Sequence, residues 1–356
     1  MRFLVTMGLA AAVIATAHAQ QGQAPTPPGQ APAPQAGAAP AMQAAPVKGA
    51  TTGFMHAIHA TNNVETTLSF YRDVFGLDTK VQPFANQAVP ILTNSPGVSL
   101  RIAMLRIPPP GRGLNFELTE FTNTERRPAR PNITDPGAPH MKFLVRDIEP
   151  VVAAAKKRNA DILTKSGVAV AMPDGVRRIF MRDPDGYLVE AVQVAPEPDA
   201  PTGNVIGAIM GLTIGNVEES MKFWRDMLGW EFAGPSPWTK VPPVVVDLMA
   251  LPDGAELRTV RAIVPGSMAR IEMLEFRGVK GKPFDLRVPD PGASGMAIRV
   301  AAIQELLPKM KASGVRVISK DEALVEWDAK TRNVFVKDPN GLLIELVGTV
   351  TPPVGK

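Results

Sequence analysis

The chain repeats itself at a fixed distance. The stretch Asp-Pro-Gly-Ala-Pro-His-Met that begins at Asp135 returns at Asp290 as Asp-Pro-Gly-Ala-Ser-Gly-Met. Asp-Pro-Asp-Gly at Asp183 returns as Asp-Pro-Asn-Gly at Asp338, and both offsets are 155 residues (290 − 135 and 338 − 183). Self-similarity at one period predicts a fold built from two copies of one unit. The first copy has a histidine where the second has a glycine, so we expect the two copies to differ in function.

The N-terminal segment has the features of a secretory signal peptide. Arg2 precedes an apolar run over residues 3–16, and Ala17-His18-Ala19 gives a small-x-small cleavage pattern. The run is too short to span a membrane as a retained helix. We therefore expect residues 1–19 to be removed and the mature protein to be periplasmic or secreted, without a membrane anchor. Residues 20–50 are nearly all Gln, Pro, Ala and Gly, which predicts a disordered linker.

Composition excludes several classes of function. Lysine and arginine number 38 against 34 acidic residues, and the net charge of +4 is scattered along the chain. A nucleic-acid-binding surface needs a basic stripe with aromatic residues, and the chain has only two tyrosines and four tryptophans. The absence of cysteine excludes disulfides, thiol nucleophiles and thiolate metal ligands. A small molecule is the expected partner, and the sequence leaves the oligomeric state open.

Each copy divides into two similar modules. Val64 to Phe75 has apolar residues at helical spacing, with Asn63 as an N-cap and Gly76 as a C-cap. Similar patterns predict helices near 148–158, 217–228 and 302–312, with Pro308 as a kink or early stop in the last. Alternating apolar residues around them predict strands. The predicted fold is α+β, with four βαβββ modules that pair into two domains, at 51–195 and 203–350.

Two stretches carry a family resemblance. Leu68 to Leu77 reads Leu-Ser-Phe-Tyr-Arg-Asp-Val-Phe-Gly-Leu, and the second module ends in Asp-Pro-Asp-Gly-Tyr-Leu-Val-Glu at Glu190. Together with the four modules, they resemble the vicinal oxygen chelate superfamily of glyoxalase I, bleomycin-resistance proteins and extradiol dioxygenases. The resemblance implies paired modules whose curved sheets form a cup. It also implies, for the enzymes, a divalent metal at the base of the cup.

The resemblance places metal ligands on the first and last strands of each module. In the first copy these positions hold His56, Glu117, His140 and Glu190. Two imidazoles and two carboxylates suit one Ni, Zn, Fe, Co or Mn ion. A polar cup without metal is the alternative, but four filled positions favour the metal. His59 points to the opposite face of its strand from His56. It is expected to be a surface or second-shell residue.

Four more residues of the first copy have an expected place. Glu120 and Tyr187 are out of phase with the ligand positions and are expected on the sheet surface. Phe84 and Phe121 are expected to line the cup. In the second copy, the ligand positions hold Ile209, Glu272, Gly295 and Glu345.

The second copy lacks both imidazoles, so it is predicted to be a degenerate domain that forms a structural or lid-like partner. Pairing of modules within each copy would collect one complete ligand set. Pairing of the first module with the fourth would give only His56, Glu117, Gly295 and Glu345. We therefore expect pairing within each copy.

The resemblance implies two enzymatic chemistries and one binding role. In the first, a metal stabilises an enediolate while a carboxylate moves the proton, with Glu190 as the first candidate for the base and Glu117 as the second. An Fe(II) extradiol-type dioxygenase needs only two histidines and one carboxylate. A bleomycin-resistance-like protein would bind a small molecule without turnover. The fourth ligand favours a lyase or isomerase of glyoxalase type.

Two departures separate the chain from glyoxalase I in the strict sense. The family's glutathione-holding arginine corresponds to Ala60 here, and its asparagine corresponds to Phe121. The expected substrate is therefore another 2-oxo, α-hydroxycarbonyl or vicinal-oxygen compound.

Overall fold

A computed structural model describes residues 51–108 and 114–350 of the chain. The predicted signal peptide (1–19) and linker (20–50) lie outside the described residues. None of the helices in the described part combines the length and the apolar character that a membrane span needs.

The described chain contains four modules, each with a helix between its first strand and its remaining strands. Module 1 consists of β1 (Thr51–Thr61), α1 (Val64–Phe75), β2 (Gln82–Phe84), α2 (Val89–Leu92), β3 (Ser99–Arg106) and β4 (Asn115–Thr122). Module 2 consists of β5 (Pro139–Val145), α3 (Glu149–Lys157), β6 (Asp161–Ile162), β7 (Val170–Ala171), β8 (Arg177–Arg182) and β9 (Leu188–Gln193).

The second copy follows the same order. Module 3 consists of β10 (Val205–Ile214), α4 (Val217–Leu228), β11 (Glu231–Phe232), β12 (Thr239–Lys240), α5 (Pro243–Leu248), β13 (Glu256–Ile263) and β14 (Arg270–Arg277). Module 4 consists of β15 (Ser294–Val300), α6 (Ile303–Ala312), the 3₁₀ turn η1 (Lys320–Glu322), β16 (Val325–Glu326), β17 (Thr331–Lys337) and β18 (Leu343–Thr349). The predicted α+β fold of four βαβββ modules is confirmed.

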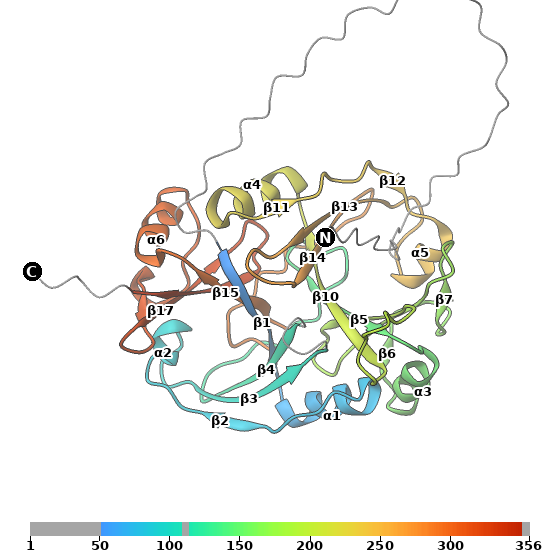
Figure 1. The fold of residues 1–356 in the computed structure, drawn as a ribbon, viewed down its shortest axis with the longest axis horizontal. Helices are drawn as coiled ribbons and strands as arrows, with labels where there is room; N and C mark the ends of the chain where they lie inside the picture. The colour runs from blue at the N-terminus through green and yellow to red at the C-terminus, as the bar shows by residue number, and fades with distance from the viewer. Residues whose placement is uncertain (1–50, 109–113, 351–356) are drawn as a thin grey trace, which may run out of the picture.

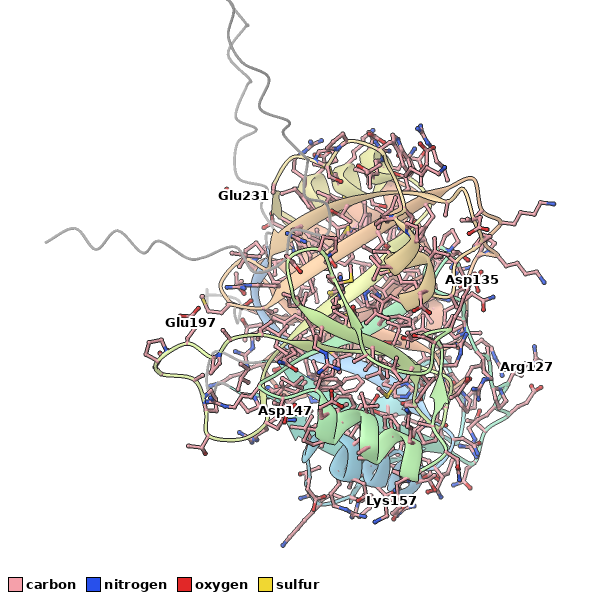
Figure 2. All side chains as sticks on the ribbon, turned by 90° about the vertical axis from the view of Figure 1, so that its right-hand side faces the viewer. Arg127, Asp135, Asp147, Lys157, Glu197 and Glu231 are labelled. Carbon is pink, nitrogen blue, oxygen red and sulfur yellow. The ribbon has the colours of Figure 1, made fainter. Side chains whose placement is uncertain are left out.

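Helices α1 and α4 begin and end where their capping residues predict. Asn63 accepts a hydrogen bond from the Thr66 amide at 2.9 Å, and Gly76 closes α1 in the left-handed conformation. Helix α4 has the same two caps, Asn216 and Gly229. Figure 2 shows Asp147 and Lys157 near the two ends of α3, on the outside of the molecule. Helix α6 runs through Pro308 to Ala312, so the proline does not stop it.

Two mixed sheets form the body of the molecule. The first has the order β16-β17-β18-β15-β1-β4-β3-β2, and the second has the order β11-β13-β14-β10-β5-β9-β8-β6. Strand β1 pairs antiparallel with β15, and β5 pairs antiparallel with β10. In Figure 1 the blue β1 lies beside the orange β15, although more than 200 residues separate them in sequence.

Modules therefore pair across the two copies. Modules 1 and 4 share the first sheet, and modules 2 and 3 share the second. The prediction that modules pair within each copy is wrong. The prediction chose the pairing that brings the most ligand residues together. Backbone pairing depends instead on which first strands lie side by side, and the four first strands have similar patterns of apolar residues.

Two long connections carry the chain between the sheets. Residues 123–138 join β4 to β5 and residues 278–293 join β14 to β15, which makes 16 residues each (138 − 123 + 1 and 293 − 278 + 1). The repeated Asp-Pro-Gly-Ala sequences lie in these connections. Asp135 accepts a hydrogen bond from the Lys282 amide at 2.8 Å, and Asp290 accepts one from the Arg127 amide at 2.9 Å. The repeated sequences therefore fasten the two crossing connections to each other.

The glycines of these sequences are required by close backbone contacts. Gly137 has a φ of +90°, and a Cβ there would lie 2.3 Å from the Asn340 carbonyl oxygen. Gly292 has a φ of +93°, and its Cβ would lie 2.3 Å from the Ala129 carbonyl oxygen. Only glycine adopts this conformation freely and fits the space.

The main core lies on the helix-covered faces of the sheets. Its buried side chains come from all four modules. On β1, Ala57 belongs to this core, whereas His56 and Ile58 line a cavity on the opposite face. Each sheet therefore has one face packed against helices and one face that borders a cavity.

Candidate functional site

Cavity 1 has a volume of about 740 Å³ and is lined by modules 1 and 4. His56 comes from β1, Glu117 from β4 and Glu345 from β18. Glu117 lies beside Ile58 in the parallel pair β1–β4, and Glu345 lies beside Ala297 in the parallel pair β15–β18. The two glutamates thus reach the cavity from last strands that flank the central β1–β15 pair.

The polar groups of cavity 1 are held by short contacts. The His56 Nε2 atom lies 3.6 Å from the Glu117 Oε2 atom. The Thr119 hydroxyl donates to Glu117 at 2.7 Å, and the Asn333 amide donates to Glu345 at 2.7 Å. These contacts orient one imidazole and two carboxylates toward the same space.

The ionised forms of the two carboxylates in cavity 1 disfavour each other. Burial and then the nearby Glu117 raise the pKa of Glu345 to about 7. Within residues 51–108 and 114–350, neither Glu117 nor Glu345 forms an ion pair with a lysine or an arginine. The cavity therefore presents a ready acceptor for a cation.

Apolar side chains form the walls of cavity 1. Phe84 stacks on Trp327, with ring centroids 5.8 Å apart and planes at 16°. Phe121 and Leu100 also line the cavity. The prediction that Phe84 and Phe121 line it is confirmed. Trp327 belongs to module 4, so its place in this cavity could not be predicted without the cross-copy pairing.

The structure separates the four predicted metal ligands. His56 and Glu117 border cavity 1, whereas His140 on β5 and Glu190 on β9 lie in the second sheet. The four residues therefore do not form one metal site, and Glu190 is not positioned to act as a base beside His56. The cause is the cross-copy pairing, which places Glu345 in cavity 1 instead.

Cavity 2, of about 640 Å³, belongs to modules 2 and 3. The equivalent glutamates are Glu272, which lines the cavity, and Glu190, which is fully buried behind the lining. Here, however, Lys142 contacts Glu272 and lies 3.6 Å from Glu190. Arg178 forms an ion pair with Glu190, and Arg261 forms one with Glu272 at 2.8 Å. Burial raises the pKa of Glu272, but Lys142 and Arg261 outweigh it and hold this pKa below its usual range.

His140 is a neutral core histidine. Burial, followed by the charge of Lys142, lowers its pKa to about 3. Neither ring nitrogen has a hydrogen-bond partner, and a Cβ on Gly211 would overlap the ring. Gly211 lies opposite His140 in the β5–β10 pair, and a glycine at this position is the sequence signal that indicates cross-copy pairing.

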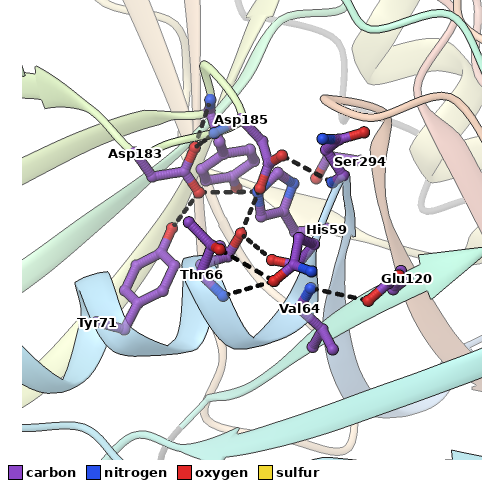
Figure 3. A network of polar contacts seen from close by, with 12 residues as sticks. His59, Val64, Thr66, Tyr71, Glu120, Asp183, Asp185 and Ser294 are labelled. Carbon is purple, nitrogen blue, oxygen red and sulfur yellow. Dashed lines mark hydrogen bonds and ion pairs between the residues drawn. The ribbon is translucent and has the colours of Figure 1, made fainter.

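His59 lies in a buried polar network between modules 1 and 2 (Figure 3). Its Nε2 atom lies 2.8 Å from Asp183 and 3.9 Å from Asp185. The prediction that it points away from His56 is confirmed, and a surface position is wrong because its side chain is fully buried. Burial lowers its pKa, but Asp183 and then Asp185 outweigh this and raise it.

The three side chains His59, Asp183 and Asp185 offer ligand atoms within 4.8 Å of one another. Their carboxylate oxygens already accept hydrogen bonds from the protein. Asp183 accepts from His59, from the Tyr71 hydroxyl at 3.1 Å and from the Tyr187 amide at 2.9 Å. Asp185 accepts from the Thr67 hydroxyl at 2.5 Å and from the Asn62 amide at 2.7 Å.

The second copy supports a structural role for this network. The positions of His59, Asp183 and Asp185 are taken there by Leu212, Asp338 and Asn340, using offsets of 153 for the first and 155 for the others. One basic and one acidic side chain are thus lost together. The numbers of acidic and basic side chains in the network stay matched, as expected for a network that joins modules.

Glu120 and Tyr187 are buried, so their expected place on the sheet surface is wrong. Glu120 accepts a hydrogen bond from the Val64 amide at 3.1 Å, at the start of α1. Its equivalent Glu275 accepts one from the Val217 amide at 3.1 Å, at the start of α4. Each carboxylate stabilises the N-terminus of a helix and so fixes the helix on its sheet.

Comparisons with known proteins agree with this architecture. The chain is 22% identical over 182 residues to a lactoylglutathione lyase of Arabidopsis thaliana, which is 49% of this chain and 54% of that protein. It therefore spans about half the length of the curated relatives it matches.

Solved structures share the fold over most of the chain. Glyoxalase I from Zea mays matches with a TM-score of 0.53 and 17% identity, covering 83% of this chain and 92% of that one. A proposed dioxygenase from Bacillus subtilis matches with a TM-score of 0.52 and 14% identity, covering 85% and 86%. A family model matches residues 53–191 and 206–346, and the chain accordingly belongs to the Glyoxalase/Bleomycin resistance protein/Dioxygenase superfamily.

Proposed function

We propose that cavity 1 binds one divalent metal ion through His56, Glu117 and Glu345, and that the protein is a lyase or isomerase of glyoxalase type. The observation that supports this most is the contrast between the two cavities. Glu190 and Glu272 are neutralised by lysine and arginine, whereas Glu117 and Glu345 have no such partner. Two partly buried carboxylates that lie near each other disfavour each other's ionised form, and a divalent cation would remove that cost.

The donor set fits a borderline or hard metal. One imidazole and two carboxylates suit Zn²⁺, Mn²⁺, Fe²⁺, Co²⁺ or Ni²⁺. Binding would draw Glu345 inward, because the donor atoms of the three residues do not all lie within 4.8 Å of one another in the structure. A bound ion would supply Lewis acidity toward two neighbouring oxygens of a substrate.

The protein's own groups would position the substrate and move the proton. Glu345 is the proposed base, in place of Glu190, because Glu190 lies in the other sheet and is held by Lys142 and Arg178. Glu345 would take the proton from the hydroxyl-bearing carbon of an α-hydroxycarbonyl compound and return it to the former carbonyl carbon, while the hydroxyl proton passes to the former carbonyl oxygen. Asn333 holds Glu345 by a hydrogen bond and so orients it.

The walls suggest an apolar substrate body. Phe84, Phe121 and Trp327 line the cavity, and Ala60 stands where the family's glutathione-binding arginine would lie. The proposed substrate is a small 2-oxo, α-hydroxycarbonyl or other vicinal-oxygen compound rather than a glutathione adduct. We also propose that the enzyme acts in the periplasm or outside the cell after removal of residues 1–19, which N-terminal sequencing of the mature protein tests.

The dioxygenase alternative is weaker in this arrangement. It requires two histidines and one carboxylate, and the second candidate, His140, is buried in the other sheet. Cavity 1 offers one histidine and two carboxylates instead.

Metal titration of the mature protein tests the metal site. Wild type should bind close to one Mn²⁺ or Co²⁺ ion per chain, and His56→Ala and Glu345→Gln should each weaken binding at least tenfold. Glu190→Gln is the matched control, because it changes the equivalent residue of cavity 2, and it should keep the ion. Metal binding that survives His56→Ala and Glu345→Gln but not Glu190→Gln would refute the assignment.

Proton transfer is tested with α-hydroxyketones in deuterated water. Exchange at the carbon next to the carbonyl, followed by NMR, should proceed without oxygen, and Glu345→Gln should slow it about 100-fold, as expected for a lost base. Oxygen consumption with catechols would favour the dioxygenase. Tight ligand binding without exchange would favour a sequestering protein.

A further inference from the structure

Cavity 2 is a second, chemically distinct compartment of the same molecule. Its volume of about 640 Å³ lies in the range of small-molecule sites. Apolar side chains from modules 2 and 3 form its walls: Leu144, Val192, Ile209, Phe232, Ala262 and Ile271. The apolar body of a ligand could therefore leave water and enter this cavity at little cost in free energy.

The floor of cavity 2 is rich in hydrogen-bond donors. Lys142 and Arg178 are each about 5% exposed. Both pair with carboxylates, Lys142 with Glu190 and Glu272 and Arg178 with Glu190. Glu190 is fully buried and does not line the cavity, whereas Lys142, Arg178 and Glu272 do. The sheltered lining of the floor therefore presents two cations and one carboxylate to a ligand.

Charges at the rim do not change this balance. Four charged residues that line the opening are exposed, namely Arg261, Arg270, Asp174 and Glu231, so water screens them. Figure 2 shows Glu231 at the edge of the molecule. The sheltered floor groups decide which end of a ligand points inward.

We propose that cavity 2 binds a small organic carboxylate, with its carboxylate group against Lys142 and Arg178 and its apolar body against the walls. In cavity 1 the register position next to Glu117 is Ile58, whereas in cavity 2 the position next to Glu190 is Lys142. The ammonium group thus supplies the positive charge within the protein itself. Cavity 2 needs an anionic, acceptor-rich ligand, whereas cavity 1 needs a cation.

Three probes with one body and different charge test the proposal on the full mature protein. 4-Phenylbutyrate, 4-phenylbutanamide and 4-phenylbutylamine are titrated by isothermal calorimetry in metal-free buffer. The carboxylate should bind at least tenfold more tightly than the amide, and the amine should bind most weakly. Equal affinity for all three, or preference for the amine, overturns the proposal.

A pair of cavity-filling variants locates the probe without altering a charge. Ile209→Trp fills cavity 2 and should weaken 4-phenylbutyrate binding at least tenfold, while Met104→Trp fills cavity 1 and should leave it within twofold. Binding lost in Met104→Trp and kept in Ile209→Trp would place the probe in cavity 1 and overturn the proposal. If Ile209→Trp fails to fold, Arg178→Gln replaces it, and unchanged carboxylate selectivity in that variant is the overturning result.

Discussion

At the scale of single residues, partners decide what a polar side chain does. His56, His59 and His140 lie on first strands, yet one borders a cavity, one joins an aspartate network and one is a neutral core residue. Strand alternation predicted which faces His56 and His59 occupy. It could not predict burial or partners, because these depend on residues more than 100 positions away, such as Asp183 for His59.

His140 should make the protein sensitive to acid. Its pKa is about 3 in the folded state and about 6.5 when unfolded, so the unfolded state binds more protons below pH 6.5. Stability should therefore fall as the pH drops from about 6.5 toward 3. His140→Leu should remove about 3 kcal/mol of the loss between pH 7.5 and 4.5.

Urea unfolding of wild type and His140→Leu at both pH values measures this difference. The other titrating groups are common to both proteins and cancel in the comparison. Parallel stability profiles for the two proteins would contradict the prediction.

At the scale of elements, local signals predicted the helices and failed at the connections. The limits of α1 and α4 follow from Asn–Gly capping pairs that act within a few residues. The repeated Asp-Pro-Gly-Ala sequences were visible too, but their role was not. Their contacts, such as Asp135 with Lys282, join segments about 150 residues apart.

The crossing connections should tolerate no side chain at Gly137. Gly137→Ala meets both a positive φ and the Asn340 carbonyl oxygen at 2.3 Å. Gly97→Ala is the matched control, because its φ of +76° is similar and nothing lies within 4 Å of the added Cβ. We expect a cost of about 1 kcal/mol for Gly97→Ala and at least about 2 kcal/mol more for Gly137→Ala.

Thermal and urea unfolding of the two variants compares these costs directly. Equal destabilisation would show that the connections can move apart and do not fasten the two sheets.

At the scale of the whole molecule, the family and the module count were predictable and the pairing was not. The choice between β5 and β15 as the partner of β1 depends on the path of the 16-residue connections and on local fits such as Gly211 under His140. The ligand set of cavity 1 followed from that choice. His56 and Glu117 were therefore placed correctly on their strands. Glu345 was grouped with the ligand positions of the second copy instead of with His56 and Glu117.

The first copy alone should form a dimer. In a fragment of residues 51–198, β1 lacks β15 and β5 lacks β10, so two unpaired edges remain. Two fragments can satisfy both edges if β1 of each pairs with β5 of the other. Each cavity of such a dimer would contain His56 and Glu117 from one fragment and His140 and Glu190 from its partner.

Analytical ultracentrifugation of this fragment, with Mn²⁺ titration, checks both expectations. The predicted species is a dimer at micromolar concentration. A well-folded monomer would show that modules 1 and 2 can pair within one copy.

Cross-copy pairing also has a consequence for how the protein could evolve. In a symmetric dimer of two-module chains, one gene specifies both cavities, so every substitution appears in each of them. Once two such chains are fused, each module contributes its strands to one cavity only. Lys142 can then neutralise cavity 2 while cavity 1 keeps its bare carboxylates, and selection can act on the two compartments separately.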